Sequence, residues 1–214
     1  HFRQARNARR GNATTMARAF AALVFRLIGW TPQPYVDVPD KCVIIGYPHT
    51  SNWDLVLLQL AAMYYGQHLN WLGKKQIFAP GIGWLMRRLG GIPVDRSAPQ
   101  GLVRQVSDEI RKARKVRLVI PPEGTRSKVD YWKSGFYRIA MEAGVPIQVA
   151  EVCYRRKIIG FGVTIAPTGD VRADMDRIRA YLSGKFGLHP ENAGAIRLRD
   201  EELRPDADAP VVKD

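Results

Sequence analysis

The residues that decide the fold are 42–54, with the sequence CVIIGYPHTSNWD. Residues 42–47 are a continuous apolar run of strand length, which predicts a strand buried inside a sheet. A short polar loop follows directly. Dense apolar residues over 53–65 then predict a helix with Ser51 as its N-cap. A buried strand that leads through a short loop into a helix is typical of an α/β domain.

Strand patterns and helix patterns alternate along the rest of the chain, with no internal repeat and no clear linker. The further expected strands cover residues 69–72, 116–120, 147–153 and 158–165. The further expected helices cover residues 81–89, 100–115 and 134–143, and a last one is outlined by Met175, Ile178, Leu182 and Phe186. We therefore expect a single α/β domain with a mixed central β-sheet flanked by helices.

The chain has 214 residues, of which 46% are hydrophobic and 25% are charged, so it can bury the core of one globular domain. We expect residues 37–188 to form this domain. Residues 1–36 precede it as a basic amphipathic segment. Residues 189–214 follow it as a polar, Pro-containing tail, which we expect to be irregular.

The N-terminal segment combines arginines with large apolar side chains and contains no acidic residue. This pattern is typical of an amphipathic helix among lipid headgroups, with arginines on anionic heads and aromatic residues below them. The expected membrane contacts are Arg18, Phe20, Phe25, Arg26 and Trp30. Two alternatives are a helix packed on its own domain and an organellar transit peptide, which is also Arg-rich and poor in acids.

No stretch has the roughly 18 to 20 uninterrupted apolar residues that a membrane-spanning helix needs, because the best run, residues 19–30, contains Arg26. We therefore expect no transmembrane helix. Lys and Arg exceed Asp and Glu by 33 to 20, a net charge of +13. A surplus of this size favours an anionic partner, which can be nucleic acid, an acidic lipid surface or a phosphorylated ligand.

Cys42 and Cys153 both lie in apolar, β-branched surroundings and have neither metal-ligand spacing nor the spacing of a secreted disulfide framework. This indicates buried thiols in a reducing compartment.

His49 is the one histidine of four that lies between a predicted buried strand and the start of a helix. Loops at strand ends are where open α/β sheets place their sites. With Asp54 in the first helical turn, its carboxylate can reach the imidazole, fix its tautomer and leave the other ring nitrogen free to take a proton. The alternative is structural: Asp54 pairs with the backbone amide of Ser51 as in a capping box, and His49 is a turn histidine.

A second polar group follows the strand at 116–120, with the sequence Glu123-Gly124-Thr125-Arg126-Ser127. The Arg126 guanidinium suits a phosphate, Thr125 and Ser127 can add hydrogen bonds, and Gly124 allows backbone amides to approach. The alternative is an ordinary β-turn with a surface ion pair. Arg96 would add another cation.

Taken in order, these pieces resemble the glycerolipid acyltransferase family, which includes glycerol-3-phosphate and lysophosphatidate acyltransferases. The His-x4-Asp signature is similar to residues 49–54, and the glycine-to-arginine signature is similar to residues 91–96. Pro-Glu-Gly-Thr-Arg-Ser is intact at 122–127, and Val-Pro-Ile stands at 145–147.

The resemblance implies that His49 deprotonates an acceptor hydroxyl while Asp54 orients His49 and balances its charge, without an acyl-enzyme. It further implies that Arg96, Glu123, Gly124 and Arg126 surround the acceptor, and that acyl-CoA or acyl carrier protein is the donor. No metal and no cofactor is implied. The family is usually bound to membranes, so we expect a peripheral protein on the cytoplasmic face of a membrane.

The predicted function is therefore transfer of a fatty acyl group to a lysophosphatidate or glycerol-phosphate-type acceptor in phospholipid synthesis. Departures from the family pattern at Pro48, Pro121 and Val149 leave another acceptor open: a different lyso-lipid, a glycolipid or an amino-acid-derived lipid. A catalytically silent membrane scaffold is a further alternative. A nucleic-acid-binding protein would also suit the charge, but no helix-turn-helix, zinc-finger or RNA-binding motif is present in the sequence.

Overall fold

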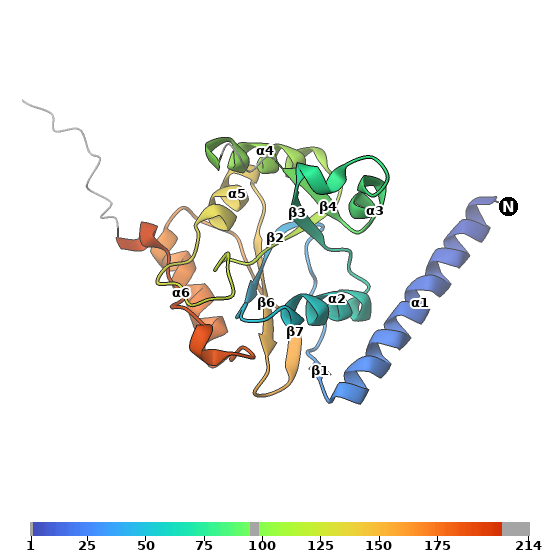
Figure 1. The fold of residues 1–214 in the computed structure, drawn as a ribbon, viewed down its shortest axis with the longest axis horizontal. Helices are drawn as coiled ribbons and strands as arrows, with labels where there is room; N and C mark the ends of the chain where they lie inside the picture. Colours follow the sequence, from blue (N-terminus) through green and yellow to red (C-terminus); the bar gives the residue numbers. More distant parts are fainter. Residues whose placement is uncertain (1, 95–98, 203–214) are drawn as a thin grey trace, which may run out of the picture.

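A mixed β-sheet lies at the centre of the computed structural model, which describes the backbone of residues 2–94 and 99–202 and the side chains of 15–94 and 101–202. Over these residues the sheet has seven strands in the order β1-β7-β6-β2-β5-β3-β4 (Figure 1). The strands are β1 (Thr31–Pro32), β2 (Lys41–Tyr47), β3 (Asn70–Lys74), β4 (Gly91–Val94), β5 (Val116–Ile120), β6 (Ile147–Cys153) and β7 (Ile158–Ile165). The expected mixed α/β fold is confirmed.

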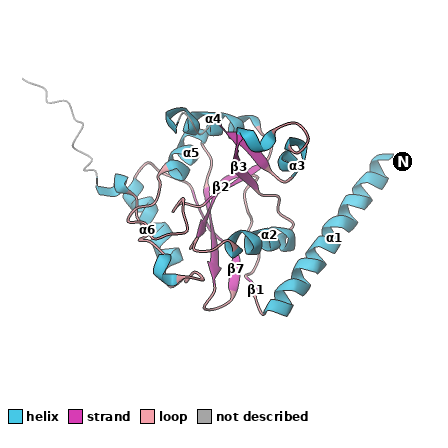
Figure 2. Cartoon of the chain, in the orientation of Figure 1, coloured by secondary structure: helices cyan, strands magenta, loops and turns pink. Residues whose placement is uncertain are grey.

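Helices cover both faces of this sheet (Figure 2). They are α1 (Phe2–Ile28), α2 (Trp53–Tyr65), α3 (Gly83–Arg88), α4 (Pro99–Lys112), α5 (Gly135–Ala143) and α6 (Val171–Leu182). Short 3₁₀ turns occur at η1 (Lys75–Phe78), η2 (Pro190–Asn192) and η3 (Arg199–Glu202).

Strand β2 occupies an inner position of the sheet, which explains its unbroken apolar sequence. It pairs in parallel with β5 on one side and with β6 on the other, so that Val43 lies between Leu118 and Ile147. Only the β6–β7 pair is antiparallel among the described strand pairs. A strand that is buried on both faces needs apolar side chains at every position rather than at alternate ones.

The two faces of β2 support two separate cores. Val43 and Ile45 pack with α4, α5 and α6, whereas Cys42 and Ile44 pack with α1 and α2. Successive side chains on a strand point to opposite faces, so one strand contributes to both cores. Both cysteine thiols are free, and Cys42 and Cys153 are buried, as the sequence predicts.

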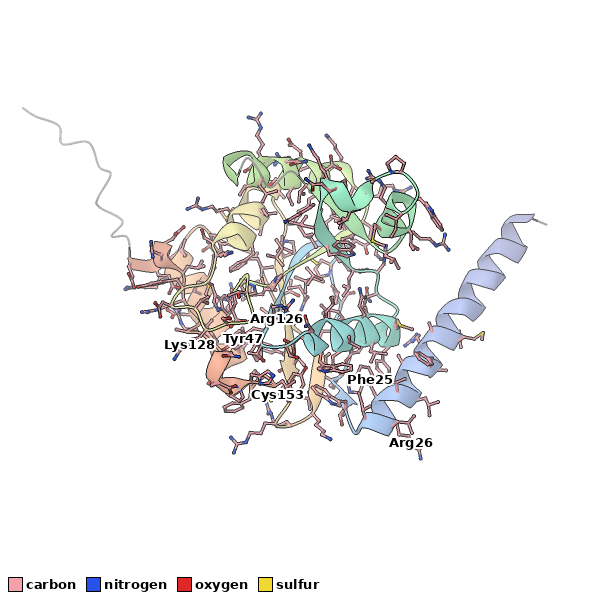
Figure 3. All side chains as sticks on the ribbon, in the orientation of Figure 1. Phe25, Arg26, Tyr47, Arg126, Lys128 and Cys153 are labelled. Atoms are coloured by element: carbon pink, nitrogen blue, oxygen red, sulfur yellow. The ribbon has the colours of Figure 1, made fainter. Side chains whose placement is uncertain are left out.

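Helix α1 has apolar residues on two opposite sides, and only one of them faces the protein. Phe25 is 1% exposed and packs against α2, whereas Arg26 points away from the domain (Figure 3). The prediction that Phe25 contacts lipid is therefore wrong, because its side chain is buried. Its position along the helix turns it towards α2, where it fills the core.

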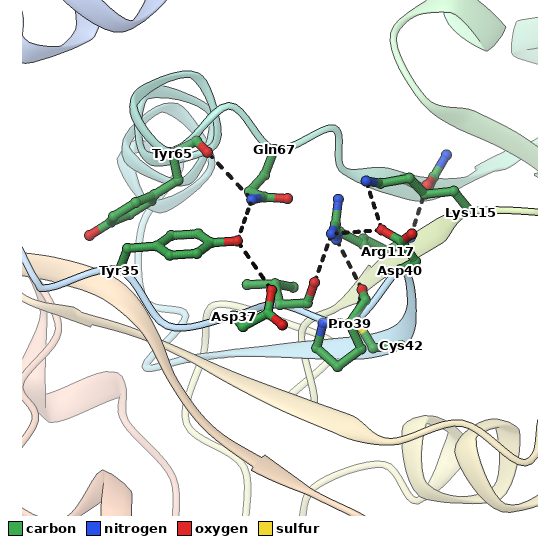
Figure 4. Close-up of polar contacts among 11 residues, drawn as sticks. Tyr35, Asp37, Pro39, Asp40, Cys42, Tyr65, Gln67, Lys115 and Arg117 are labelled. Atoms are coloured by element: carbon green, nitrogen blue, oxygen red, sulfur yellow. Dashed lines mark hydrogen bonds and ion pairs between the residues drawn. The ribbon is translucent and has the colours of Figure 1, made fainter.

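A clasp around Arg117 holds the segment before β2 against β5 (Figure 4). The guanidinium is almost fully buried and donates to the carbonyl oxygens of Pro39 at 3.0 Å and Val38 at 2.7 Å. Its Nη2 also lies 3.1 Å from Asp40, which is exposed and pairs with Lys115 as well. A buried guanidinium requires such partners, so the clasp fixes where β2 starts.

The predicted helices and strands agree with the structure apart from a few ends. The N-cap of α2 is Asn52 instead of Ser51, and Phe186 lies beyond the end of α6. The tail is mostly irregular from residue 189 to 202, apart from η2 and η3, as expected, but it packs against the domain: Leu198 is 1% exposed and forms a parallel β-bridge with Trp132. Ile196 also packs against the core, and the Gly194 amide donates a hydrogen bond to Glu123, so several contacts join this segment to the domain.

Candidate active site

His49 and Asp54 come together at the carboxyl end of β2. His49 lies in the loop that follows the strand, and Asp54 lies in the first turn of α2. His49 Nδ1 is 3.3 Å from Asp54 Oδ2, with side chains that are 22% and 7% exposed. Among the described residues, no group makes a hydrogen bond with His49 Nε2, so this nitrogen remains available to a substrate.

The Asp54 carboxylate is held from several directions. Oδ2 also accepts hydrogen bonds from the backbone amides of Thr50 at 2.8 Å and Ser51 at 2.9 Å, and Oδ1 accepts one from the Tyr154 hydroxyl at 2.8 Å. The two interpretations of the sequence, a partner of His49 and a brace of the helix start, are therefore both met by one carboxylate. The aspartate cannot turn away from the imidazole without losing these bonds.

These contacts keep Asp54 ionised. Burial alone would raise the pKa of Asp54, but the hydrogen bonds from His49, the Ser51 amide and Tyr154 outweigh burial and bring it below its ordinary value. A carboxylate that remains charged can stabilise a neighbouring imidazolium.

Glu123 lies in the loop after β5 and is used within the protein. Its side chain is 1% exposed, and Oε2 accepts a 2.7 Å hydrogen bond from the His49 amide while Oε1 accepts one from the Gly194 amide at 3.4 Å. Burial raises the pKa of Glu123, although both hydrogen bonds act against the shift. The resemblance implies that Glu123 contacts the acceptor. In the structure its carboxylate links three segments of the chain: its own loop, the loop at His49 and the segment at Gly194.

The other residues of this loop face outward. Gly124 has a φ of +67°, and the side chain of Lys133 lies over it: a Cβ there would come within 2.7 Å of Lys133 Cε. The positive φ favours glycine at this position, whereas the flexible end of Lys133 could move aside for a larger side chain. Thr125, Arg126 and Ser127 are exposed, and Thr125 Oγ1 accepts a hydrogen bond from the Ser127 amide.

His49, Asp54 and Arg126 line one cavity of about 220 Å³. The walls of this cavity are otherwise mainly apolar, and include Leu55, Leu58, Val119, Val152 and Ile159. The arrangement brings a base, a cation and an apolar wall together at one end of the sheet.

Among the described residues, the other predicted positions do not line this cavity. Arg96 lies outside the described residues. Arg18 donates a 3.1 Å hydrogen bond to the Tyr64 carbonyl oxygen, and Trp30 packs edge-on against Tyr154 with ring centroids 5.0 Å apart. Phe20 and Arg26 remain exposed.

Sequence reasoning missed Tyr154 as a partner of Asp54. The two residues are 100 positions apart, and nothing in the sequence around Tyr154 marks it. One signal was present: the predicted strand 147–153 ends just before Tyr154, and the carboxyl ends of parallel strands meet at one edge of a sheet.

Among the side chains of residues 15–94 and 101–202, no three His, Cys, Asp or Glu residues come together as metal ligands. Over the same residues, no helix combines the length and the hydropathy that crossing a bilayer would take.

This fold, with a histidine and an aspartate at the end of β2, is that of an acyltransferase domain. Residues 34–151 match the family described as Acyltransferase, and the chain belongs to this family. The resemblance to glycerolipid acyltransferases that the sequence predicted is thereby confirmed.

Individual relatives agree with this assignment. A 1-acyl-sn-glycerol-3-phosphate acyltransferase from Pseudomonas aeruginosa is 28% identical over 117 residues, 52% of this chain and 44% of the relative. A lyso-ornithine lipid O-acyltransferase from the same organism is 32% identical over 150 residues, 66% of this chain and 52% of the relative. The chain thus spans about half the length of these curated relatives.

A solved structure has the same fold. The 1-acyl-sn-glycerophosphate (LPA) acyltransferase PlsC from Thermotoga maritima aligns with a TM-score of 0.55 and 16% identity. The alignment covers 83% of this chain and 79% of that one.

Proposed function

We propose that this chain is an O-acyltransferase that moves a fatty acyl group from a thioester to the hydroxyl of a lyso-lipid. The observation that carries the proposal is the His49–Asp54 pair at an apolar cavity that Arg126 also lines. A free imidazole nitrogen supplies a base, the apolar wall suits an acyl chain, and the guanidinium suits an anionic headgroup.

The reaction needs no protein nucleophile. The acceptor hydroxyl gives its proton to His49 Nε2 as its oxygen attacks the thioester carbonyl carbon and forms a tetrahedral intermediate. The C–S bond then breaks, the carbonyl re-forms in the new ester, and the imidazolium returns the proton to the departing thiolate. Asp54 stabilises the imidazolium between these two proton transfers. The acyl group passes directly from donor to acceptor, and no metal or cofactor enters this scheme.

For the acceptor we favour lysophosphatidate. Arg126 is exposed at the cavity, and the Lys133 side chain crosses the neighbouring Gly124, so two cations flank this turn. A phosphate monoester can accept charge-assisted hydrogen bonds from both. One of the relatives is described as acting on lyso-ornithine lipid, which makes that amino-acid-derived lipid the main alternative.

The donor is acyl-CoA or acyl carrier protein. Either would place its acyl chain along the apolar wall that includes Leu58, Val119 and Ile159. The thioester carbonyl would then lie near His49, at the polar end of the same cavity.

We further propose that α1 holds the enzyme on an anionic membrane surface. Four apolar residues spaced along one side of the helix are at least half exposed: Met16, Phe20, Leu23 and Leu27. The opposite side, with Ala21 and Phe25, is buried against the domain. An outward apolar side beside Arg26, on a chain with a net charge of +13, suits a peripheral membrane protein.

The acceptor assignment is tested by Arg126→Ala. Loss of a charge-assisted bond to phosphate should raise KM for lysophosphatidate roughly 10- to 100-fold with a small change in kcat, since such a bond acts in both ground and transition states. KM for lyso-ornithine lipid should change little. Steady-state kinetics on both acceptors provide the measurement.

Lys128→Ala is the matched control. Lys128 is exposed and lies two positions further along, but it does not line the cavity (Figure 3). Its removal should leave both acceptors unaffected. Equal losses on both acceptors in Arg126→Ala, or equal effects of the two substitutions, would count against phosphate recognition by Arg126.

A further inference from the structure

Tyr154 holds the oxygen of Asp54 that His49 does not use. Its hydroxyl donates a 2.8 Å hydrogen bond to Oδ1, while Oδ2 faces His49 and the two backbone amides. Each carboxylate oxygen therefore has its own set of donors. A buried carboxylate with both oxygens bonded has one orientation, and this orientation points Oδ2 at the imidazole.

Tyr154 is in turn fixed by the end of α1. It begins the turn between β6 and β7, and the Trp30 ring packs edge-on against its ring with an interplanar angle of 89°. The Thr31 amide donates a 2.8 Å hydrogen bond to the Lys157 carbonyl oxygen in the same turn, and Lys157 Nζ bonds to the Ile28 carbonyl oxygen. The segment that leaves α1 is thus attached to the turn that carries Tyr154.

We propose that Tyr154 is a positioning residue of the His49–Asp54 pair, and that Trp30 supports it from the end of α1. The inference rests on the proposed function, because it assumes that this pair performs the proton transfer. Tyr154 acts through Asp54: it fixes the carboxylate and shares its charge.

Several groups face Asp54 and decide its charge. His49 and Tyr154 contact the carboxylate directly, and the Thr50 and Ser51 amides donate hydrogen bonds to it. Glu123 is a second buried carboxyl at this site, and the charge of Asp54 helps to raise its pKa. Removing the tyrosine hydroxyl leaves Oδ1 without a donor, so the pKa of Asp54 should rise towards its ordinary value. A carboxylate that is less firmly held and less completely ionised supports a protonated His49 less well.

The test is Tyr154→Phe, which removes the hydroxyl and keeps the ring that Trp30 contacts. We expect kcat to fall roughly 10-fold with KM for both substrates nearly unchanged, as for loss of one hydrogen bond to a charged group. The dependence of kcat on pH, on the acidic side of the optimum, should also differ from that of wild type. Carboxyl ¹³C NMR titration of Asp54, assigned with Asp54→Asn, should show a higher pKa and needs no turnover.

Tyr137→Phe is the matched control. The Tyr137 hydroxyl also donates a 2.8 Å hydrogen bond to a buried carboxylate, that of Asp174, which lies at α6 and away from the cavity. This variant should lose stability but keep the kcat–pH profile and the titration of Asp54. Trp30→Leu should reduce kcat less than Tyr154→Phe and add little to it in the double variant, since both act through one contact.

These experiments distinguish failure of the Tyr154 proposal from failure of the proposed acyltransferase function. Wild-type kinetics and an unchanged Asp54 titration in Tyr154→Phe would overturn the inference, as would an equal response to Tyr137→Phe. If transfer persists in His49→Ala, the proposed function fails instead. The Asp54 titration would still report whether Tyr154 holds the carboxylate.

Discussion

At the scale of single residues, Asp54 combines a structural role with the geometry of a catalytic one. Two backbone amides, an imidazole and a phenol converge on its two oxygens. The amides tie the loop after β2 to the start of α2, so the bonds that shape the loop also set the orientation of the carboxylate. The local sequence of six residues thus brings His49 and Asp54 together, and the distant Tyr154 holds the second oxygen of the carboxylate.

This role has a measurable pH dependence. The pKa of Asp54 is held below its unfolded value, so its contribution to stability is fully present above the unfolded pKa of about 3.9 and is lost as pH falls through the lower folded value. Asp54→Asn should lower the free energy of unfolding by about 1–3 kcal/mol at pH 7.

Urea unfolding between about pH 2 and 7 measures this difference. The difference in unfolding free energy between wild type and Asp54→Asn should become smaller as the solution becomes more acidic. Glu123 contributes in the opposite direction, because burial raises its pKa, but it is present in both proteins and its contribution largely cancels. If this difference in unfolding free energy did not change with pH, the charge of Asp54 would not stabilise the fold.

At the scale of elements, α1 has two apolar faces with different tasks. One packs on α2 through Ala21 and Phe25, and the other, which includes Phe20 and Leu27, has no partner among the described residues. Large apolar side chains that are left exposed on one side of a helix mark a binding surface when they form a continuous strip. The segment just after this helix reaches the candidate active site through the contact of Trp30 with Tyr154.

Phe25→Ala and Phe20→Ala should separate the two faces. Truncating the buried Phe25 should cost about 3 kcal/mol of unfolding free energy, because it leaves a cavity against α2. Truncating Phe20, which is 56% exposed, should change stability by less than about 0.5 kcal/mol and weaken binding to anionic vesicles.

Chemical denaturation and vesicle sedimentation provide the two measurements. Full retention of vesicle binding by a Phe20→Ala, Leu27→Ala double variant would exclude this face as the lipid contact. Equal stability losses in the two single variants would contradict the buried and exposed assignment.

At the scale of the whole molecule, much of the fold follows from the sequence because its signals are local. The inner strands β2, β5, β6 and β7 are short and mainly apolar, with exceptions such as Arg117 in β5 and Gln148 and Glu151 in β6, and they were predicted closely. The edge strands β1 and β4 were not predicted, since they are short and contain Pro32 and Pro93. Pairing of such edges depends on neighbours that a sequence pattern does not include.

The candidate site also has one part that the sequence predicts and another that only the folded chain brings together. His49 and Asp54 are five positions apart, and their contact follows from a loop and one helical turn. Tyr154 and Gly194 reach the site from distant segments, so only the folded chain brings them there. Periodicity also could not distinguish Phe20 from Phe25 as the outward residue, because both sides of α1 are apolar.

The central claim, that His49 is the base in acyl transfer to a lyso-lipid, is tested most directly by transfer of radiolabelled acyl groups from acyl-CoA and acyl carrier protein to lysophosphatidate and lyso-ornithine lipid. The comparison includes wild type, His49→Ala and a control, His68→Ala, which changes an exposed histidine. The three proteins are compared under conditions in which their unfolding free energies are similar. We predict product from wild type and His68→Ala, and a rate at least about 100-fold lower from His49→Ala. A folded His49→Ala protein that transfers acyl groups at the wild-type rate would contradict the account.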